Sequence, residues 1–203
     1  MSARAIRPRL LAIWGLLLVL VVAIAAIELR DRANAPLDPD NVRDPRMLLP
    51  VPLAQLGVVE IAHAGALHRF ERDSAGGWFY HGVHTAAQGA HAHQPDPALA
   101  QRIDTALTAF GRTHIEREMS LAKGPQEYGL ANPQMVILVY APKELKPLAQ
   151  YAVGDVAPDT YSRYILVVGR PNVGTIPNYQ IENLLGLIKA ASEQSAKATA
   201  QSR

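Results

Sequence analysis

The sequence predicts an α+β fold, in which a mainly antiparallel sheet packs against two helices and one transmembrane helix precedes the domain. A long apolar run without charges lies near the N-terminus. Short alternating or continuously apolar runs, typical of strands, fill much of the remaining chain. Two segments with apolar residues at helical spacing interrupt these runs without regular β–α–β alternation, which favours an antiparallel sheet.

The apolar run covers residues 10–27 and contains 18 consecutive residues without a charge. As a helix it would be roughly 27 Å long, which matches the hydrocarbon core of a bilayer. Arg4, Arg7 and Arg9 precede it, so the positive-inside rule places the N-terminus in the cytoplasm. We therefore expect residues 10–29 to anchor the protein with the bulk of the chain outside the cytoplasm. The sequence has no Asn-x-Ser/Thr glycosylation site, which is consistent with a bacterial source, so the expected location is the inner membrane with the domain in the periplasm.

A cleaved signal peptide is the alternative interpretation of this run. However, the run is longer than the apolar region of an ordinary signal peptide. The small-x-small match Ala33-Asn34-Ala35 is also followed by Pro36, and a proline directly after the scissile bond is expected to block cleavage. The uncleaved anchor is therefore the favoured interpretation.

The positions of the charges argue against a nucleic-acid partner. The chain has 20 basic and 18 acidic residues, but Arg4, Arg7 and Arg9 precede every acidic one. Residues 28–203 therefore carry a slight acidic excess and lack the basic surface that phosphate binding requires. The chain also has no cysteine, which excludes disulfides, thiolate nucleophiles and cysteine-ligated metal centres.

The sequence divides the chain into five parts. Residues 1–9 form the cytoplasmic N-terminus and residues 10–29 the anchor. Residues 30–51 combine prolines with charges and predict an extended stalk. Residues 52–191 hold the α+β domain. Residues 192–203 are small and polar and predict a disordered tail.

The domain should begin with a three-stranded meander over Val58–Ala62, Leu67–Arg72 and Trp78–Tyr80. A helix should follow, with Asp96 as its N-cap and Pro97 at its first position. Its apolar stripe comprises Leu99, Ile103, Ala106, Leu107 and Phe110, and Gly111 ends it. The later expected elements are an edge strand at Thr113–Glu118, a central strand at Met135–Tyr140, strands at Ala149–Val153 and Tyr161–Val168, and a helix capped by Asn178.

Several motifs follow one another in a recognisable order. They are Gly76-Gly77-Trp78, Glu127-Tyr128-Gly129-Leu130, Asn132-Pro133, the strand Met135–Tyr140, Tyr151-Ala152-Val153-Gly154 and Tyr161-Ser162-Arg163-Tyr164. Over roughly residues 56–190 this order resembles a bacterial domain-of-unknown-function family with a YGL…P motif. Members of that family stand behind one N-terminal transmembrane helix and often neighbour components of gliding-motility-type ABC transporters.

The resemblance implies an extracytoplasmic α+β domain that serves as an accessory or scaffolding part of a membrane assembly, and it implies no catalytic activity. The chain departs from the family pattern after Trp78, where a histidine-rich loop replaces a short proline-containing passage. Physically, we interpret Tyr128, Gly129, Leu130 and Pro133 as a packing motif. In it Gly129 takes a positive φ, the two larger side chains fill the core, and the proline starts a strand.

All seven histidines fall within one stretch of the chain. They are His63, His68, His81, His84, His91, His93 and His114. The densest part, from His81 to His93, offers four imidazoles that would suit copper or zinc: His81, His84, His91 and His93. The competing interpretation is a solvated polar loop, because no carboxylate-buttressed motif occurs and ordering a long loop costs entropy.

The sequence contains no motif typical of an enzyme. We find no nucleophile elbow and no paired-carboxylate motif, and Gly169–Gly174 is typical of a hairpin turn rather than a phosphate-binding loop. Tyr161, Arg163 and Tyr164 form a candidate surface patch for a partner, with half-buried strand positions as the alternative.

These observations predict a non-enzymatic, single-pass membrane protein whose extracytoplasmic domain is an accessory or assembly subunit of a membrane protein complex. The expected partners are the bilayer and an integral membrane protein, and no cofactor is needed. The alternative function is the binding or delivery of copper or zinc by the histidine loop.

Overall fold

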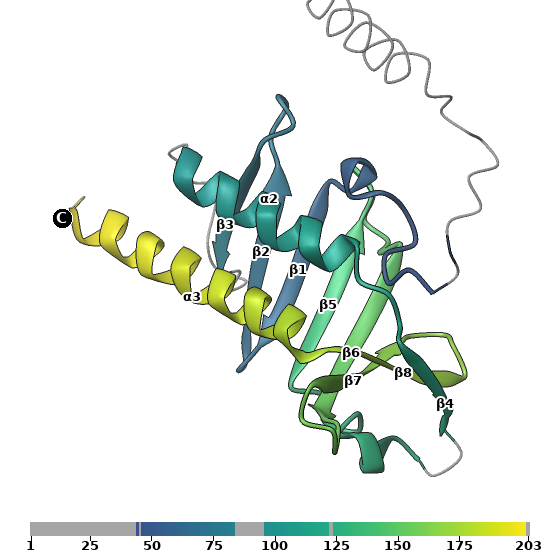
Figure 1. Ribbon diagram of the computed structural model, residues 1–203. Coiled ribbons are helices and arrows are strands. Elements are labelled where there is room, and N and C mark those ends of the chain that lie inside the picture. The colour runs from purple at the N-terminus through teal and green to yellow at the C-terminus, as the bar shows by residue number, and fades with distance from the viewer. Residues whose placement is uncertain (1–43, 45, 84–95, 122–123, 202–203) are drawn as a thin grey trace, which may run out of the picture. The chain divides into compact units, whose positions relative to one another are not determined.

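The computed structural model describes residues 44, 46–83, 96–121 and 124–201 (Figure 1). They form an α+β unit with an eight-stranded antiparallel sheet and two long helices, which confirms the predicted fold class for this part of the chain. The predicted anchor, residues 10–29, lies outside the described residues. None of the helices in the described ranges has both the length and the apolar composition needed to cross a membrane.

The strands lie side by side in the order β3-β2-β1-β5-β6-β7-β8-β4, and each neighbouring pair is antiparallel. Their bounds are β1 Val58–His63, β2 Ala66–Arg72, β3 Trp78–Val83, β4 Arg117–Ser120, β5 Met135–Tyr140, β6 Ala149–Val156, β7 Ser162–Val167 and β8 Asn172–Pro177. Of the short 3-10 helices, η1 (Leu53–Gln55) precedes β1 and η3 (Pro125–Tyr128) lies between β4 and β5 in the chain.

The first three strands form the predicted meander, and the turn residues explain its tight connections. Ala64 and Gly65 join β1 to β2 with φ values of 50° and 79°, a backbone twist that suits a two-residue hairpin. In the β2–β3 turn, Asp73 Oδ1 accepts hydrogen bonds from the backbone N–H groups of Ala75 and Gly77. Asparagine and aspartate favour turns because their short side chains make such local bonds.

The later strands differ in detail from the sequence prediction. β5 is central, as predicted, and its side chains alternate between buried and half-buried positions. β6 runs on to Val156 through a register shift. β4 starts only at Arg117, because His114 forms an isolated bridge with Met47 instead. β8 begins at Asn172, inside the segment predicted as a hairpin turn.

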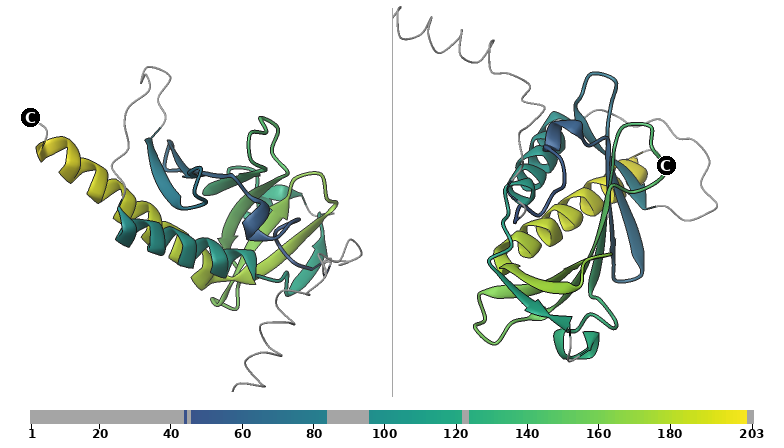
Figure 2. Two further views of the ribbon diagram at one scale, coloured as in Figure 1. Left: turned by 90° about the horizontal axis from the view of Figure 1, so that it is seen from above. Right: turned by 90° about the vertical axis from the view of Figure 1, so that its right-hand side faces the viewer.

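Both helices lie on the same face of the sheet (Figures 1 and 2). α2 spans Pro97–Gly111 and α3 spans Asn178–Gln201. Asp96 caps α2 as predicted, because its Oδ1 accepts hydrogen bonds from the N–H groups of Ala98 and Leu99. The buried side of α2 is the predicted stripe, with Leu99, Ile103, Leu107 and Phe110 facing the core.

The main hydrophobic core lies between these helices and the sheet. α3 contributes Ile181, Leu184, Leu187 and Ile188 to it, and the ring of Phe110 meets Tyr151 of β6 edge-on with centroids 6.0 Å apart. Burial of each large apolar side chain stabilises the fold by about 1.5–3 kcal/mol. The packing of two helices on one sheet face therefore supplies most of the hydrophobic stabilisation of this domain.

The structure differs from the sequence prediction at both boundaries of the domain. Leu48 and Leu49, at the end of the predicted stalk, belong to the main core, and the Tyr151 hydroxyl donates a hydrogen bond of 2.7 Å to the Leu48 carbonyl. At the other end, α3 continues from residue 192 to Gln201, through the predicted disordered tail. The alanine, glutamate, glutamine and lysine residues of that segment have high helix propensity, which explains the continuation.

One buried histidine should make the stability of the domain depend on pH. His68 of β2 is 6% exposed, and its Nδ1 lies 2.8 Å from the Tyr80 hydroxyl of β3. Burial, with a smaller contribution from His63, lowers the pKa of His68 below its ordinary value of 6.5. Below about pH 6.5 the unfolded chain therefore binds a proton that the folded state resists, and stability falls as the pH falls.

We predict that the free energy of unfolding of the detergent-solubilised chain decreases by at most about 1.4 kcal/mol per pH unit between pH 6.5 and 5. The replacement His68→Gln should flatten this profile, as measured by urea unfolding at each pH. If the free energy of unfolding decreased equally with falling pH in the wild type and in His68→Gln, the assignment of this pH dependence to His68 would be wrong.

Candidate functional site

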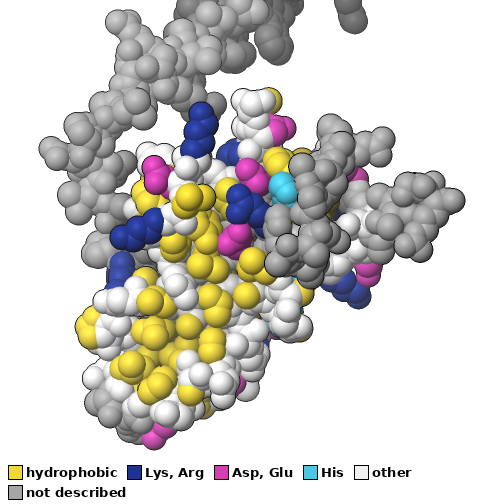
Figure 3. Space-filling view, turned by 180° about the vertical axis from the view of Figure 1, so that it is seen from behind, with side chains coloured by type: hydrophobic (Ala, Val, Ile, Leu, Met, Phe, Trp, Pro, Cys, Tyr) yellow, Lys and Arg dark blue, Asp and Glu magenta, His cyan; other side chains and the backbone are white. Residues whose placement is uncertain are grey.

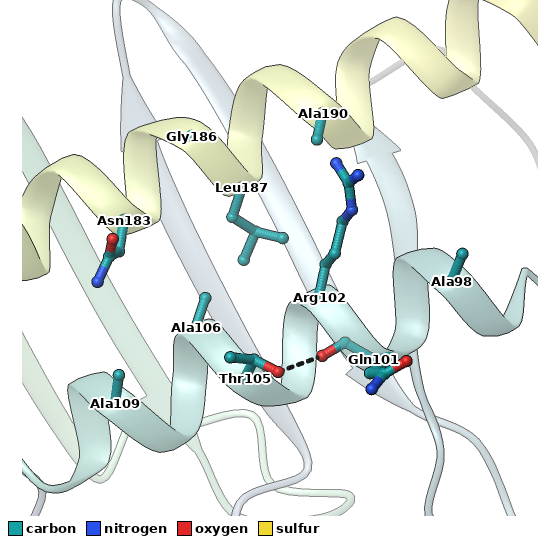
Figure 4. Close-up of a pocket in the computed structure, with 10 residues that line it drawn as sticks. All are labelled: Ala98, Gln101, Arg102, Thr105, Ala106, Ala109, Asn183, Gly186, Leu187 and Ala190. Carbon is teal, nitrogen blue, oxygen red and sulfur yellow. Dashed lines mark hydrogen bonds between the residues drawn. The ribbon is translucent and has the colours of Figure 1, made fainter.

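A groove of about 570 Å³ lies between α2 and α3 (Figure 4). Small side chains line much of it, including Ala98, Ala106 and Ala190. Arg102 is its one ionisable lining residue, and the hydroxyl of Thr105 donates to the backbone of its own helix, at the Gln101 carbonyl. The lining therefore holds neither a general acid–base pair nor an activated nucleophile.

The sheet face opposite the helices, which we call the open face, has a different character. Figure 3 shows this face from behind, with a continuous apolar area over its lower half and charged side chains above it. The strand register explains the apolar area, because directly paired residues point to the same side of a sheet. One row of such partners crosses seven strands and is apolar throughout: Leu67, Ala62, Val136, Ala152, Leu166, Val173 and Met119.

This apolar row is only partly covered within the described chain. Val173 is fully buried, whereas the other six side chains are half-buried. Tyr128 and Leu130, which flank the end of η3, pack on Val173 and form a second, smaller core at the β8 end of the row. Toward β5 and β1, neither helix covers the row, since both lie on the other face (Figure 2).

The predicted packing motif supplies that second core. Tyr128 meets the ring of Tyr164 edge-on with centroids 5.0 Å apart, and Leu130 is 7% exposed. Gly129 has φ of 68°, and a Cβ at this position would lie 2.4 Å from the Asp155 carboxyl carbon. Pro133 is half-buried and precedes β5 by two residues.

Trp78, the last residue of the predicted Gly76-Gly77-Trp78 motif, lies away from this second core. It belongs to the main core with 3% exposure, and the guanidinium of Arg72 lies 4.4 Å above its ring. The motif residues therefore serve two different parts of the fold.

The charged part of the open face is a network with internally paired charges. Arg69 Nη1 donates to Glu60 Oε1 at 2.7 Å, and its Nε donates to Glu71 Oε2 at 3.1 Å. The Tyr140 hydroxyl donates to the other oxygen of Glu60 at 2.8 Å. Burial would lower the pKa of Arg69, but the hydrogen bonds to both carboxylates outweigh burial and raise that pKa.

Tyr140 stays protonated in this network. Burial and the hydrogen bond to the Glu60 carboxylate raise its pKa to about 12, so the phenol remains a donor at physiological pH. Each charged side chain of this network has a partner within it, and with one guanidinium for two carboxylates the three side chains carry a net charge of −1.

Of the four predicted metal ligands, only His81 lies within the described residues. His84, His91 and His93 fall in the range 84–95, which the structure does not describe. His81 is on β3, with its Nδ1 3.4 Å from Glu71 Oε2. In the described ranges, no three histidine or carboxylate side chains come together in a way that would hold a metal ion.

The predicted patch of Tyr161, Arg163 and Tyr164 is divided by the structure. Tyr161 is 81% exposed, whereas Tyr164 packs on Tyr128 and Arg163 donates hydrogen bonds to Asn178 and Gln134. Sequence reasoning did not separate these roles. The signal that could have separated them is Asp159, a turn-favouring residue: its Oδ1 accepts hydrogen bonds from the N–H groups of Tyr161 and Ser162, so Tyr161 lies in the turn before β7.

Comparison with protein-family models, with curated proteins and with solved structures found no match for this chain. The resemblance to the YGL…P family therefore stays a prediction from the motifs.

We predict that Gly129→Ala destabilises the domain by at least about 1–2 kcal/mol, the cost of holding a non-glycine residue in the left-handed region. The close approach of Asp155 should add to this cost. Urea unfolding of the detergent-solubilised chain measures the change. The control Gly65→Ala also has positive φ, but its Cβ would meet no atom within 4 Å, so a smaller loss is expected there. Equal losses at the two positions would argue against close packing at Gly129.

Proposed function

We propose that this protein is a non-enzymatic accessory subunit of a membrane assembly, anchored by residues 10–29, with its domain on the extracytoplasmic side. The open face of the sheet binds an apolar surface of an integral membrane protein. The observation that carries this proposal is the apolar row across seven strands, half-buried except at Val173, which neither α2 nor α3 covers toward β5 and β1.

The apolar row supports a protein partner because of its extent and its surroundings. Monomeric soluble domains rarely leave large contiguous apolar patches in water, and such patches rimmed by polar groups mark interaction sites. Here the rim is the network of Arg69, Glu60 and Glu71, whose charges are paired internally. The interface that fits is therefore apolar at its centre and makes few new ion pairs.

The membrane location rests on the sequence. The uncharged run of residues 10–27 and the three preceding arginines support an anchor with the domain outside the cytoplasm. The lining of the α2–α3 groove, with a single ionisable residue, supports a binding role over catalysis.

A charge placed in the apolar row should disrupt the assembly. We predict that Val136→Glu abolishes co-elution with a stoichiometric integral membrane protein when the full chain is purified in mild detergent. The matched control is Gln150→Glu, a half-buried position on the same face and the neighbouring strand, outside the apolar row. It introduces the same charge and should preserve the complex. Light scattering after size exclusion gives the mass of each species.

Two outcomes would overturn the proposed function. One is a wild-type chain that elutes only as a monomer in its detergent micelle. The other is equal retention of the partner by both variants, with unchanged circular dichroism, which would place the interface elsewhere.

The alternative function, metal binding by the histidine loop, has a separate test. It predicts a saturable titration of the detergent-solubilised full chain with Cu²⁺ or Zn²⁺ in calorimetry. Replacing His81, His84, His91 and His93 together by alanine should abolish that binding, because imidazole is the expected ligand. Replacing His63 and His114 by alanine should leave the metal binding intact. A wild-type chain that binds neither metal stoichiometrically would exclude this alternative.

A further inference from the structure

The loop between β5 and β6 exposes a leucine almost completely. Leu145 is 96% exposed, and it lies between Lys143 and Lys146 in a segment bounded by Pro142 and Pro147. Both lysines are exposed, and neither lies within ion-pair distance of a carboxylate in the described part of the chain.

The backbone of this loop has a defined shape. Lys143 has φ of 65°, in the left-handed region that non-glycine residues rarely adopt. The base of the loop is closed by a hydrogen bond of 2.7 Å from the Leu148 N–H to the Val139 carbonyl. It also packs tightly on Gly57, where a Cβ would lie 2.6 Å from Pro142 Cα. The loop therefore holds Leu145 outward on a firm base.

The exposed leucine is not isolated. Leu148 just before β6 is 43% exposed, and Val168 just after β7 is 52% exposed. The two strands are neighbours, and the Val168 N–H donates to the Gln150 carbonyl of β6 at 2.8 Å. These three apolar side chains thus gather at one end of the sheet, together with the two lysines. We call this group the Leu145 end.

The combination of a protruding apolar side chain with flanking lysines is complementary to an anionic bilayer surface. Acyl chains accept the leucine, while phosphate groups attract the ammonium groups at headgroup level. Glu144 opposes one lysine, so the loop keeps a net positive charge of one in a domain with no basic excess of its own.

We propose that the Leu145 end contacts the anionic lipid surface of the membrane, with Leu145 inserted at the boundary between headgroups and acyl chains. This inference rests on the proposed membrane anchor. The chain between the anchor and the domain is long enough for this contact. If fully extended, residues 30–43 would reach up to about 50 Å from the anchor to the first described residue.

The test uses the full chain, whose lack of cysteine allows a single reactive site to be introduced. Leu145→Cys is labelled with the environment-sensitive fluorophore NBD, and the chain is reconstituted into vesicles of phosphatidylcholine with or without one third phosphatidylglycerol. We expect blue-shifted emission, and quenching by nitroxide lipids, in the anionic vesicles. The matched control is Tyr161→Cys, an exposed position at the other end of β7, where the label should report water.

The lysines are tested in the same labelled background. Each lysine near an anionic surface contributes about a fivefold preference for the bound state, so Lys143→Gln with Lys146→Gln should lower the ratio of inserted to exposed label by about 25-fold. High salt should have a similar effect on the wild type, because it screens the attraction. Insertion that is unchanged by both treatments would overturn the electrostatic part of the proposal.

The remaining outcomes separate this inference from the proposed anchor. If the chain floats with vesicles in a density gradient but the labels at 145 and 161 are equally exposed to water, the lipid contact is wrong and the anchor stands. If the label at 145 is shielded only in native membranes and not in pure lipid, a protein covers this end, and the lipid contact is again wrong. If the chain does not float, both the anchor and the contact are contradicted.

Discussion

The packing of α2 and α3 on one face of a wide sheet determines the character of the other face. Ile103, Leu107 and Leu184 are almost completely buried in that packing. Two helices cover one layer of an eight-stranded sheet, so the opposite face must be stabilised by other means. Near β1 and β2 the charges of that face satisfy one another, and near β8 the segment around η3 covers it. Between these two regions, apolar side chains such as Ala62 and Val136 stay half-buried with neither helix over them.

Much of the fold was predictable from local signals. All the signals that predict α2 lie within 15 consecutive residues: the Asp96 cap, the proline after it and the apolar stripe. The structure confirms them. The role of Leu48 was not predictable, because its partner Tyr151 lies 103 residues further along the chain. The candidate site was also only partly predictable. The residues around Gly129 could be recognised as a packing motif, but their position against Val173 depends on strand order, which no local pattern encodes.

The two proposed surfaces share one structural element. β5 contributes Val136 to the apolar row near its start, and it leads into the loop that carries Leu145 at its end. Its other face supplies Met135, Ile137 and Val139 to the main core. A central strand with both neighbours paired is among the stiffest elements of a sheet, because each of its backbone groups is held on both sides. The fold therefore fixes the spacing between the two regions proposed to bind protein and lipid.

The hydrogen bond between Tyr151 and the Leu48 carbonyl has a mechanical consequence. Leu48 and Leu49 are the first apolar residues of the described chain to enter the core, and Tyr151 belongs to β6, well inside the sheet. Tension applied to the chain before Asp44 would thus be transmitted to the middle of the domain rather than peeling off an edge strand. A domain built in this way resists being unravelled from its N-terminal end, because extension past Met47 must expose two buried leucines and break a buried hydrogen bond.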